Sequence, residues 1–147
     1  MSTIESLLNL KRWSEDEAKN LFALRLKELA VEEKRLADME EQYRDIDCRF
    51  EAASSELIDV DEIKKLNEYL GHLLVRIRRQ REVIILKETL VEEARKMLQE
   101  ASKEKKTFEK LDEKQKRHLR EAAMKKEQIG TDEHAGVRHA RKTGERQ

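Results

Sequence analysis

Few residues in this chain are of the types that carry out chemistry, and their spacing builds none of the usual active sites. The one cysteine, Cys48, has no second thiol and no nearby histidine with which to form a metal site or an activated nucleophile. The stretch Gly130–Gly136 lacks the Gly-Lys-Ser/Thr of a phosphate-binding loop, and His134 and His139 lack the glutamate of a helical metalloprotease motif. We therefore expect no catalytic residue, no metal site and no cofactor.

The composition favours long helices over a compact enzyme domain. Of the 147 residues, 44% are charged and 4% are aromatic, and the chain has four glycines and no proline. Ordinary domains contain about 25% charged residues, and such an excess is typical of a coiled coil. A rod of two helices has no concave pocket in which reacting groups could be positioned away from water, so the chain is not expected to be an enzyme.

Three further features bear on location. No run of about 18 apolar residues could cross a membrane. The N-terminus lacks the charged-then-apolar layout of a signal peptide. A single cysteine cannot form an internal disulfide, which fits a reducing cytosol. A cytoplasmic protein is therefore expected.

Two apolar seams, each with a residue every seven positions, run along the chain, as in a coiled coil. The first consists of Phe22, Leu29, Leu36, Tyr43, Phe50 and Leu57, and the second of Ile63, Leu70, Ile77, Ile84, Val91 and Leu98. Each seam also has a second set of positions, three residues after the first set, which we call the alternating positions. In the second seam they include Leu66, Leu73 and Gln80. Two seams of similar length predict two long helices, so the fold class is all-α.

The two seams also predict a register. When residues are paired so that their numbers add to 120, all six layers are apolar, from Leu57 with Ile63 to Phe22 with Leu98. An antiparallel hairpin that turns near residue 60 produces this pattern. The same register places Glu33 opposite Lys87, which could help to fix the pairing. Near the termini it places Trp13 almost opposite Phe108, and Leu8 almost opposite Leu111.

Cap and stop signals set the expected boundaries. Asp59 with Glu62, and Ser2 with Glu5, have the spacing of a capping box. Gly130 after Ile129 is a good helix stop. We expect an antiparallel coiled coil over 1–129, with helices at about 4–57 and 62–129 and a turn at about 58–61. A flexible basic tail is expected over 130–147.

Charge is unevenly distributed along the chain. Residues 1–60 carry a net charge of −6 and residues 61–147 a net charge of +6. A basic run at Arg76, Arg78, Arg79 and Arg81 could bind nucleic acid, and such binding would collapse with salt. No aromatic residues are interleaved to stack on bases, and the acidic half of the chain offsets the charge, so no nucleic-acid partner is expected. The rod is expected to be monomeric on its own.

The order and spacing of several segments resemble one known family, the bacterial flagellar export protein FliJ. The resemblance covers roughly residues 5–135. It includes the opening Leu8–Arg12, the uneven acidic hairpin, the stretch Leu66–Gln80 and the C-terminal Phe108-Glu-Lys-Leu-Asp-Glu-Lys, followed by Arg117 and Glu127-Gln128. No single piece is specific, but the order and total length together are.

What the resemblance implies is a stalk of the flagellar type III export apparatus, used in flagellum biogenesis and motility. The end that bears both termini would enter the hexameric export ATPase FliI, the middle of the rod would contact the export gate FlhA, and the protein would also escort export chaperones. It would work in the cytoplasm, associated with the inner-membrane export apparatus only through partners. By resemblance, gate contacts would come from Tyr43, Tyr69, Leu73 and Gln80, and ATPase contacts from Leu8, Trp13, Phe108, Leu111, Arg117 and Gln128.

Two other interpretations stay open from the sequence. The stalk proteins of injectisome type III secretion share this architecture and role. A generic coiled-coil scaffold or chaperone that holds a partner helix would also fit, because Tyr69 lies off the strict seam and would be partly exposed. Such a rod could itself dimerise into a four-helix bundle.

Overall fold

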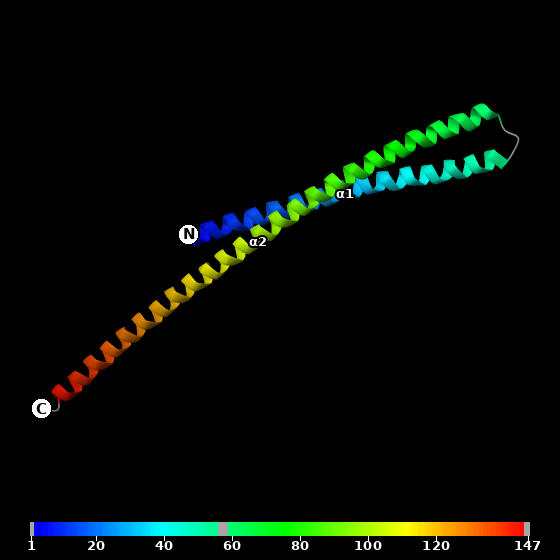
Figure 1. Cartoon of the computed structure of the whole chain (residues 1–147). Coiled ribbons are helices and arrows are strands. Elements are labelled where there is room, and N and C mark those ends of the chain that lie inside the picture. The colour runs from blue at the N-terminus through cyan, green and yellow to red at the C-terminus, as the bar shows by residue number, and fades with distance from the viewer. Residues whose placement is uncertain (1, 56–58, 146–147) are drawn as a thin grey trace. The chain divides into compact units, whose positions relative to one another are not determined.

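The chain folds into two long α-helices. In the computed structural model, which describes residues 2–55 and 59–145, α1 spans Thr3–Ser55 and α2 spans Val60–Glu145 (Figure 1). No strand occurs in the described part of the chain. The predicted fold class, all-α with two long helices packed as an antiparallel coiled-coil hairpin, is confirmed.

Both helices begin at capping residues that the sequence indicated. The amide of Glu5 donates to Oγ of Ser2 at 3.2 Å, and the amide of Ser2 donates to Oε2 of Glu5 at 3.4 Å, a complete capping box. At α2, the amide of Asp61 donates to Oδ1 of Asp59 at 3.3 Å. Each cap gives a partner to amides that no helical carbonyl can reach, which fixes where the helices start.

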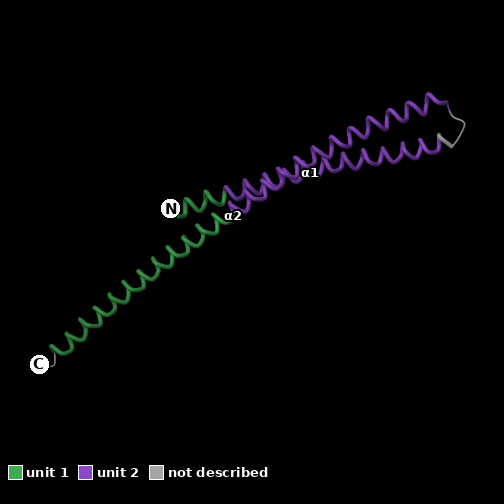
Figure 2. The backbone as a smooth tube through the Cα atoms, in the orientation of Figure 1, with its two compact units in different colours: residues 1–13, 102–147 green, residues 14–101 purple. Residues whose placement is uncertain are grey.

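The chain divides into two compact units, which we describe separately (Figure 2). Unit 2, residues 14–101, pairs most of α1 with the first half of α2. Its core follows the heptad on α2, where Leu70, Leu73, Ile77, Gln80, Ile84 and Ala94 are all buried. The 3-4 spacing of these positions keeps one stripe of α2 against α1, which is the packing of a coiled coil.

The predicted seam residues lie on these stripes. On α1, Phe22, Leu29, Leu36, Tyr43 and Phe50 are half-buried, and on α2 Ile63, Val91 and Leu98 are half-buried as well. Leu57 lies outside the described residues. The half-burial follows from the architecture, since a side chain between only two helices keeps one side toward solvent.

Unit 1 contains residues 1–13 and 102–147. The first turns of α1 pack on α2 here, and the buried residues are Leu8 and Asp112. Past Gln115, every described side chain of α2 as far as Gly144 is exposed. This stretch is helical without a second helix covering any of its faces.

The predicted end of the second helix was wrong. α2 continues through Gly130 and ends at Glu145, so the expected tail over 130–147 is helical over its described part. Glycine stops a helix when it adopts a left-handed conformation, and no described glycine has a positive φ. Without proline, a glycine inside a run of helix-forming residues weakens the helix by about 1 kcal/mol but does not end it.

Two predicted contacts were also wrong. Glu33 is exposed, and Lys87 instead reaches Oε2 of Glu28 at 3.5 Å, because Glu28 borders the seam while Glu33 points away from it. Trp13 is 58% exposed, and Nζ of Lys11 lies 5.6 Å from the centre of the Phe108 ring. Lys11 is at a seam position of α1, whereas Trp13 projects from the opposite face of that helix.

Candidate partner-binding sites

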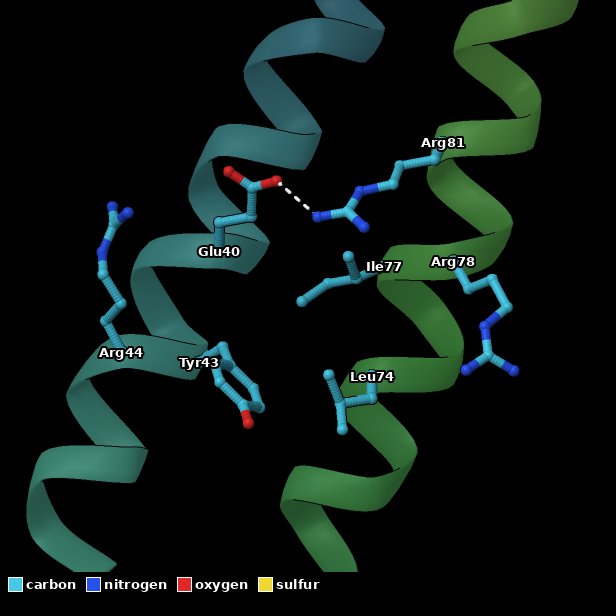
Figure 3. Close-up of a pocket in the computed structure, with 7 residues that line it drawn as sticks. All are labelled: Glu40, Tyr43, Arg44, Leu74, Ile77, Arg78 and Arg81. Carbon is cyan, nitrogen blue, oxygen red and sulfur yellow. Dashed lines mark hydrogen bonds and ion pairs between the residues drawn. The ribbon is translucent and has the colours of Figure 1, made fainter. Parts of the chain in front are cut away.

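A groove between the helices of unit 2 gathers the apolar and charged side chains expected of a contact site. It has a volume of about 380 Å³ and is lined by Glu40, Tyr43, Arg44, Leu74, Ile77, Arg78 and Arg81. Figure 3 shows Tyr43 and Leu74 facing each other across it, with Ile77 between Leu74 and Arg81 along α2 and with Arg44 and Arg78 pointing outward. An ion pair between Arg81 and Glu40, at 3.3 Å, closes one end of the groove.

The four residues expected at the export gate divide into two pairs. Tyr43 lines the groove and Tyr69 is 47% exposed, so a partner could touch both. Leu73 is only 1% exposed and Gln80 is buried, so neither is part of the surface. Both occupy the alternating seam positions of α2, where they hold together the helices that carry half-buried Tyr43 and exposed Tyr69.

Gln80 makes a cross-helix lock that the sequence did not predict. Its Nε2 donates to the backbone oxygen of Glu32 at 2.9 Å and to Oε2 of the same residue at 2.6 Å. These bonds compensate the burial of an amide in an otherwise apolar stripe. The signal that could have found this lock is the heptad itself, since Glu32 follows the seam residue Leu29 by three positions, as Gln80 follows Ile77.

Nearby, Glu28 lies between two cations. Nη1 of Arg25 donates to its Oε2 at 3.1 Å, and Nζ of Lys87 lies 3.5 Å from the same oxygen. The hydrogen bond from Arg25, together with the charge of Lys87, holds the pKa of Glu28 below its ordinary value. On the solvent side of α2, Arg95 likewise lowers the pKa of Glu92, and Glu92 raises that of Arg95. These are electrostatic supports of the helices and show no arrangement for proton transfer.

In unit 1 the contact between the helices is largely polar. Nζ of Lys11 pairs with Oε2 of Glu104 at 2.8 Å while lying over the ring of Phe108. Buried Asp112 pairs with Lys116 at 3.1 Å. Leu8 is buried at a small notch that Asp112 and Lys116 also line. A short, charged interface of this kind gives little apolar burial, so unit 1 is held more weakly than unit 2.

The six residues expected at the ATPase lie in unit 1 but not on one surface. Leu8 is buried and Phe108 is half-buried beneath Lys11. Trp13, Leu111, Arg117 and Gln128 are exposed. Four large apolar side chains on the uncovered part of α2 were not predicted as contact residues. They are 52–67% exposed, and they are Leu119, Met124, Ile129 and Val137. Exposed apolar residues on a helix beyond its seam were the available signal.

Other kinds of site are not found in the described part of the chain. No group of three or more histidine, cysteine, aspartate or glutamate side chains there could hold a metal ion. None of the described helical segments is long and apolar enough to cross a membrane. Cys48 is an exposed thiol on α1.

Comparison with known proteins identifies the family. Searches among curated proteins and among solved structures gave no match to the chain. The family model of the flagellar FliJ protein matches residues 1–144, nearly the whole sequence. The chain therefore belongs to the flagellar FliJ protein family, whose proteins are associated with flagellar protein export.

Proposed function

We propose that this chain is the cytoplasmic stalk of the flagellar export ATPase FliI, with unit 1 as the end that enters the hexameric ring. The observation that carries the proposal is the uncovered stretch of α2. Past Gln115 its described side chains are all exposed, and among them stand Leu119, Met124 and Ile129. A helical stretch whose described side chains are all exposed finds no packing partner within the chain, whereas a ring of subunits around the helix would supply one.

The character of this stretch suits contacts that can be exchanged. Its apolar residues are scattered among charges of both signs, so any one subunit of a ring would meet a small, mostly polar surface. Small polar interfaces are the weak ones. Weak contacts to several subunits would allow the helix to slip or turn within the ring, while a large dry interface would hold it in one position.

The groove of unit 2 would serve a different partner. We assign the contact with the export gate FlhA to the exposed parts of Tyr43 and Leu74, flanked by Arg78. Tyr69 directly precedes the seam residue Leu70, so it lies on the other flank and outside this groove. Aromatic side chains beside arginine are enriched where proteins bind each other. Escort of export chaperones belongs to the same proposal and is assigned to no residue. The protein would reach the membrane only through these partners.

The test uses the hydrolysis rate of FliI with and without the chain. The full chain is expected to raise the rate. A chain that ends at His118 keeps the bond between Lys116 and Asp112, and every described side chain that it lacks is exposed, so it should melt at the same temperature but lose the stimulation. The matched control is the full chain with Ile85→Asp, an exposed apolar residue of unit 2. Full stimulation by the shortened chain would refute the assignment of unit 1.

The assignment of the gate is tested separately. Leu74→Ala combined with Arg78→Ala should weaken binding to FlhA and leave stimulation of the ATPase unchanged, because both side chains line the groove and are exposed on unit 2. Unchanged binding to FlhA by this variant would exclude the groove as the contact.

A further inference from the structure

One flank of unit 2 carries more exposed apolar side chains than the other, although Glu28 and Glu93 lie among them. Its most exposed members are Leu24, Val31, Leu86 and Met97, which are 50–65% exposed. Half-buried Leu21, Val83 and Leu90 lie between them and the seam. We call this set of side chains the apolar flank. Single exposed apolar residues are ordinary, but a contiguous group on one side of a protein indicates an interaction surface.

The heptad places these residues on the same side of the two helices. Leu24, Val31 and Leu86 each follow a seam residue by two positions, and Met97 precedes Leu98 by one. In a heptad both offsets fall on one side of the seam, and an offset of four falls on the other side. Glu40 and Arg81 each follow a seam residue by four, and they pair across the helices at 3.3 Å. Like flanks of α1 and α2 therefore meet, so the apolar residues of both helices share one flank.

The opposite flank is different. It carries the ion pair of Arg81 with Glu40 and that of Arg95 with Glu92. Apolar residues occur there too, such as Leu74 and Ile85, but Arg78 and Arg81 stand between them. Exposed apolar side chains are therefore more frequent on the apolar flank than on the opposite one.

Charge at the ends of the apolar flank indicates what would cover it. The part of the flank toward residues 14 and 101 is acidic, with Glu28 and Glu93 inside it and Glu17 and Glu100 at its end. The part toward the hairpin carries Arg35, Arg76 and Arg79, together with the acid Asp38. A surface with an acidic end and a basic end is complementary to itself when one copy is inverted. A twofold axis through the middle of the patch produces that inversion, and twofold dimers are the commonest protein assemblies.

We propose that the apolar flank binds a second copy of this chain, with the two copies antiparallel and related by a twofold axis. Leu86 of each copy packs against the apolar flank of the other, and Arg79 of each lies toward the acidic part of the other, which carries Glu17, Glu93 and Glu100. The four helices of two units 2 then form a bundle. This departs from the monomer expected from the sequence. It goes beyond the proposed stalk function, because it concerns the free protein and involves no residue of unit 1.

The first test is the native mass of the full chain alone, measured over a wide range of concentration. A dimer is expected at high concentration. Leu86→Glu should weaken the dimer about tenfold or more, because it places a carboxylate in the apolar contact. Ile85→Glu is the matched control: the neighbouring residue is 61% exposed against 65% for Leu86, but it lies on the opposite flank. Both variants should keep the helicity of the original chain.

The second test is an exchange of charge. Arg79→Glu and Glu100→Arg should each weaken the dimer, and mixing the two variants should restore a dimer that contains one chain of each. A chain that stays monomeric at every concentration would overturn the proposal. So would a dimer that Leu86→Glu leaves intact, or one that Ile85→Glu weakens equally. A monomer whose apolar flank is protected only when FliI or FlhA is added would assign the flank to that protein instead.

Discussion

The paired half of α2, residues 60–115, and its uncovered half, residues 116–145, are both helical and similarly rich in charge but have very different surroundings. Up to Gln115 the helix has a buried stripe, and residues such as Leu73 and Ile77 are nearly inaccessible. Beyond it no described side chain is buried. Helical propensity is therefore shared by both halves, while tertiary burial belongs to one. Stability should depend on the paired half, and partner binding on the uncovered half.

The largest difference between the halves is expected from a charge placed in the seam. Leu73→Asp puts a carboxylate at a position that is 1% exposed, and should destabilise the chain by more than about 4 kcal/mol. Leu119→Asp, at a position that is 65% exposed, should change stability by less than about 0.5 kcal/mol. Thermal unfolding followed by circular dichroism measures both. Equal effects would mean that the two halves do not differ as described.

The next largest effect concerns the lock between Gln80 and Glu32. Gln80→Ala removes both bonds to Glu32 and leaves a partly buried carboxylate without this donor, which should cost about 1–3 kcal/mol. Gln128→Ala, in the uncovered half, is the control and should cost nothing measurable. Denaturant unfolding gives both values. A neutral Gln80→Ala would show that the bonds are exchanged for water without loss.

Removal of the helix cap should have a smaller effect. Asp59→Ala leaves the amide of Asp61 without its acceptor and should cost about 1 kcal/mol in global stability. Asp132→Ala, an exposed residue within the uncovered half, should cost nothing because alanine is the better helix former. If Asp59→Ala unfolds at the same denaturant concentration as the original chain, the cap does not stabilise α2.

Two glycines allow the same change in each half. An added Cβ would meet nothing within 4 Å at either Gly71 or Gly130. Gly71→Ala should raise global stability by about 0.5–1 kcal/mol through helix propensity. Gly130→Ala should leave the melting temperature unchanged and slow hydrogen exchange only around residue 130. A rise in melting temperature with Gly130→Ala would mean that the uncovered half unfolds together with the rest.

The smallest effect is a dependence on pH. Because the pKa of Glu28 is lowered in the folded chain, its charge stabilises the fold above the ordinary glutamate pKa, and this contribution is lost as the pH falls through the lowered value. Glu28→Gln should therefore reduce the melting temperature slightly at neutral pH and not at about pH 3. An equal difference at both pH values would exclude the charge of Glu28 as the cause.

Much of the fold could be predicted because the residues that make the contacts of a coiled coil recur at a fixed spacing in the sequence. Phe50 with Leu70 and Tyr43 with Ile77 recur at a spacing that only two facing helices explain. The end of α2 could not be predicted in the same way. Gly130 permits either a left-handed stop or a continued helix, and the choice depends on backbone conformation that residue types alone do not determine.

The surface residues were harder to predict than the core. Leu73 and Gln80 were expected to face a partner through resemblance, although their seven-residue spacing from Leu66 already placed them on the seam. Lys11, at a seam position near the end of α1, covers Phe108 through its aliphatic stem and charge, where an aromatic neighbour was expected. Long polar side chains at seam positions reach across in ways that the apolar pattern does not encode.

The most direct test of the central claim is the native mass of the chain mixed with the export ATPase FliI in the presence of nucleotide. The account predicts a complex of one chain with a ring of six ATPase subunits, and loss of that complex when the chain ends at His118. A complex with another stoichiometry, or a ring that forms equally well without the chain and never contains it, would contradict the stalk. The protein would then be a two-helix scaffold for a different partner.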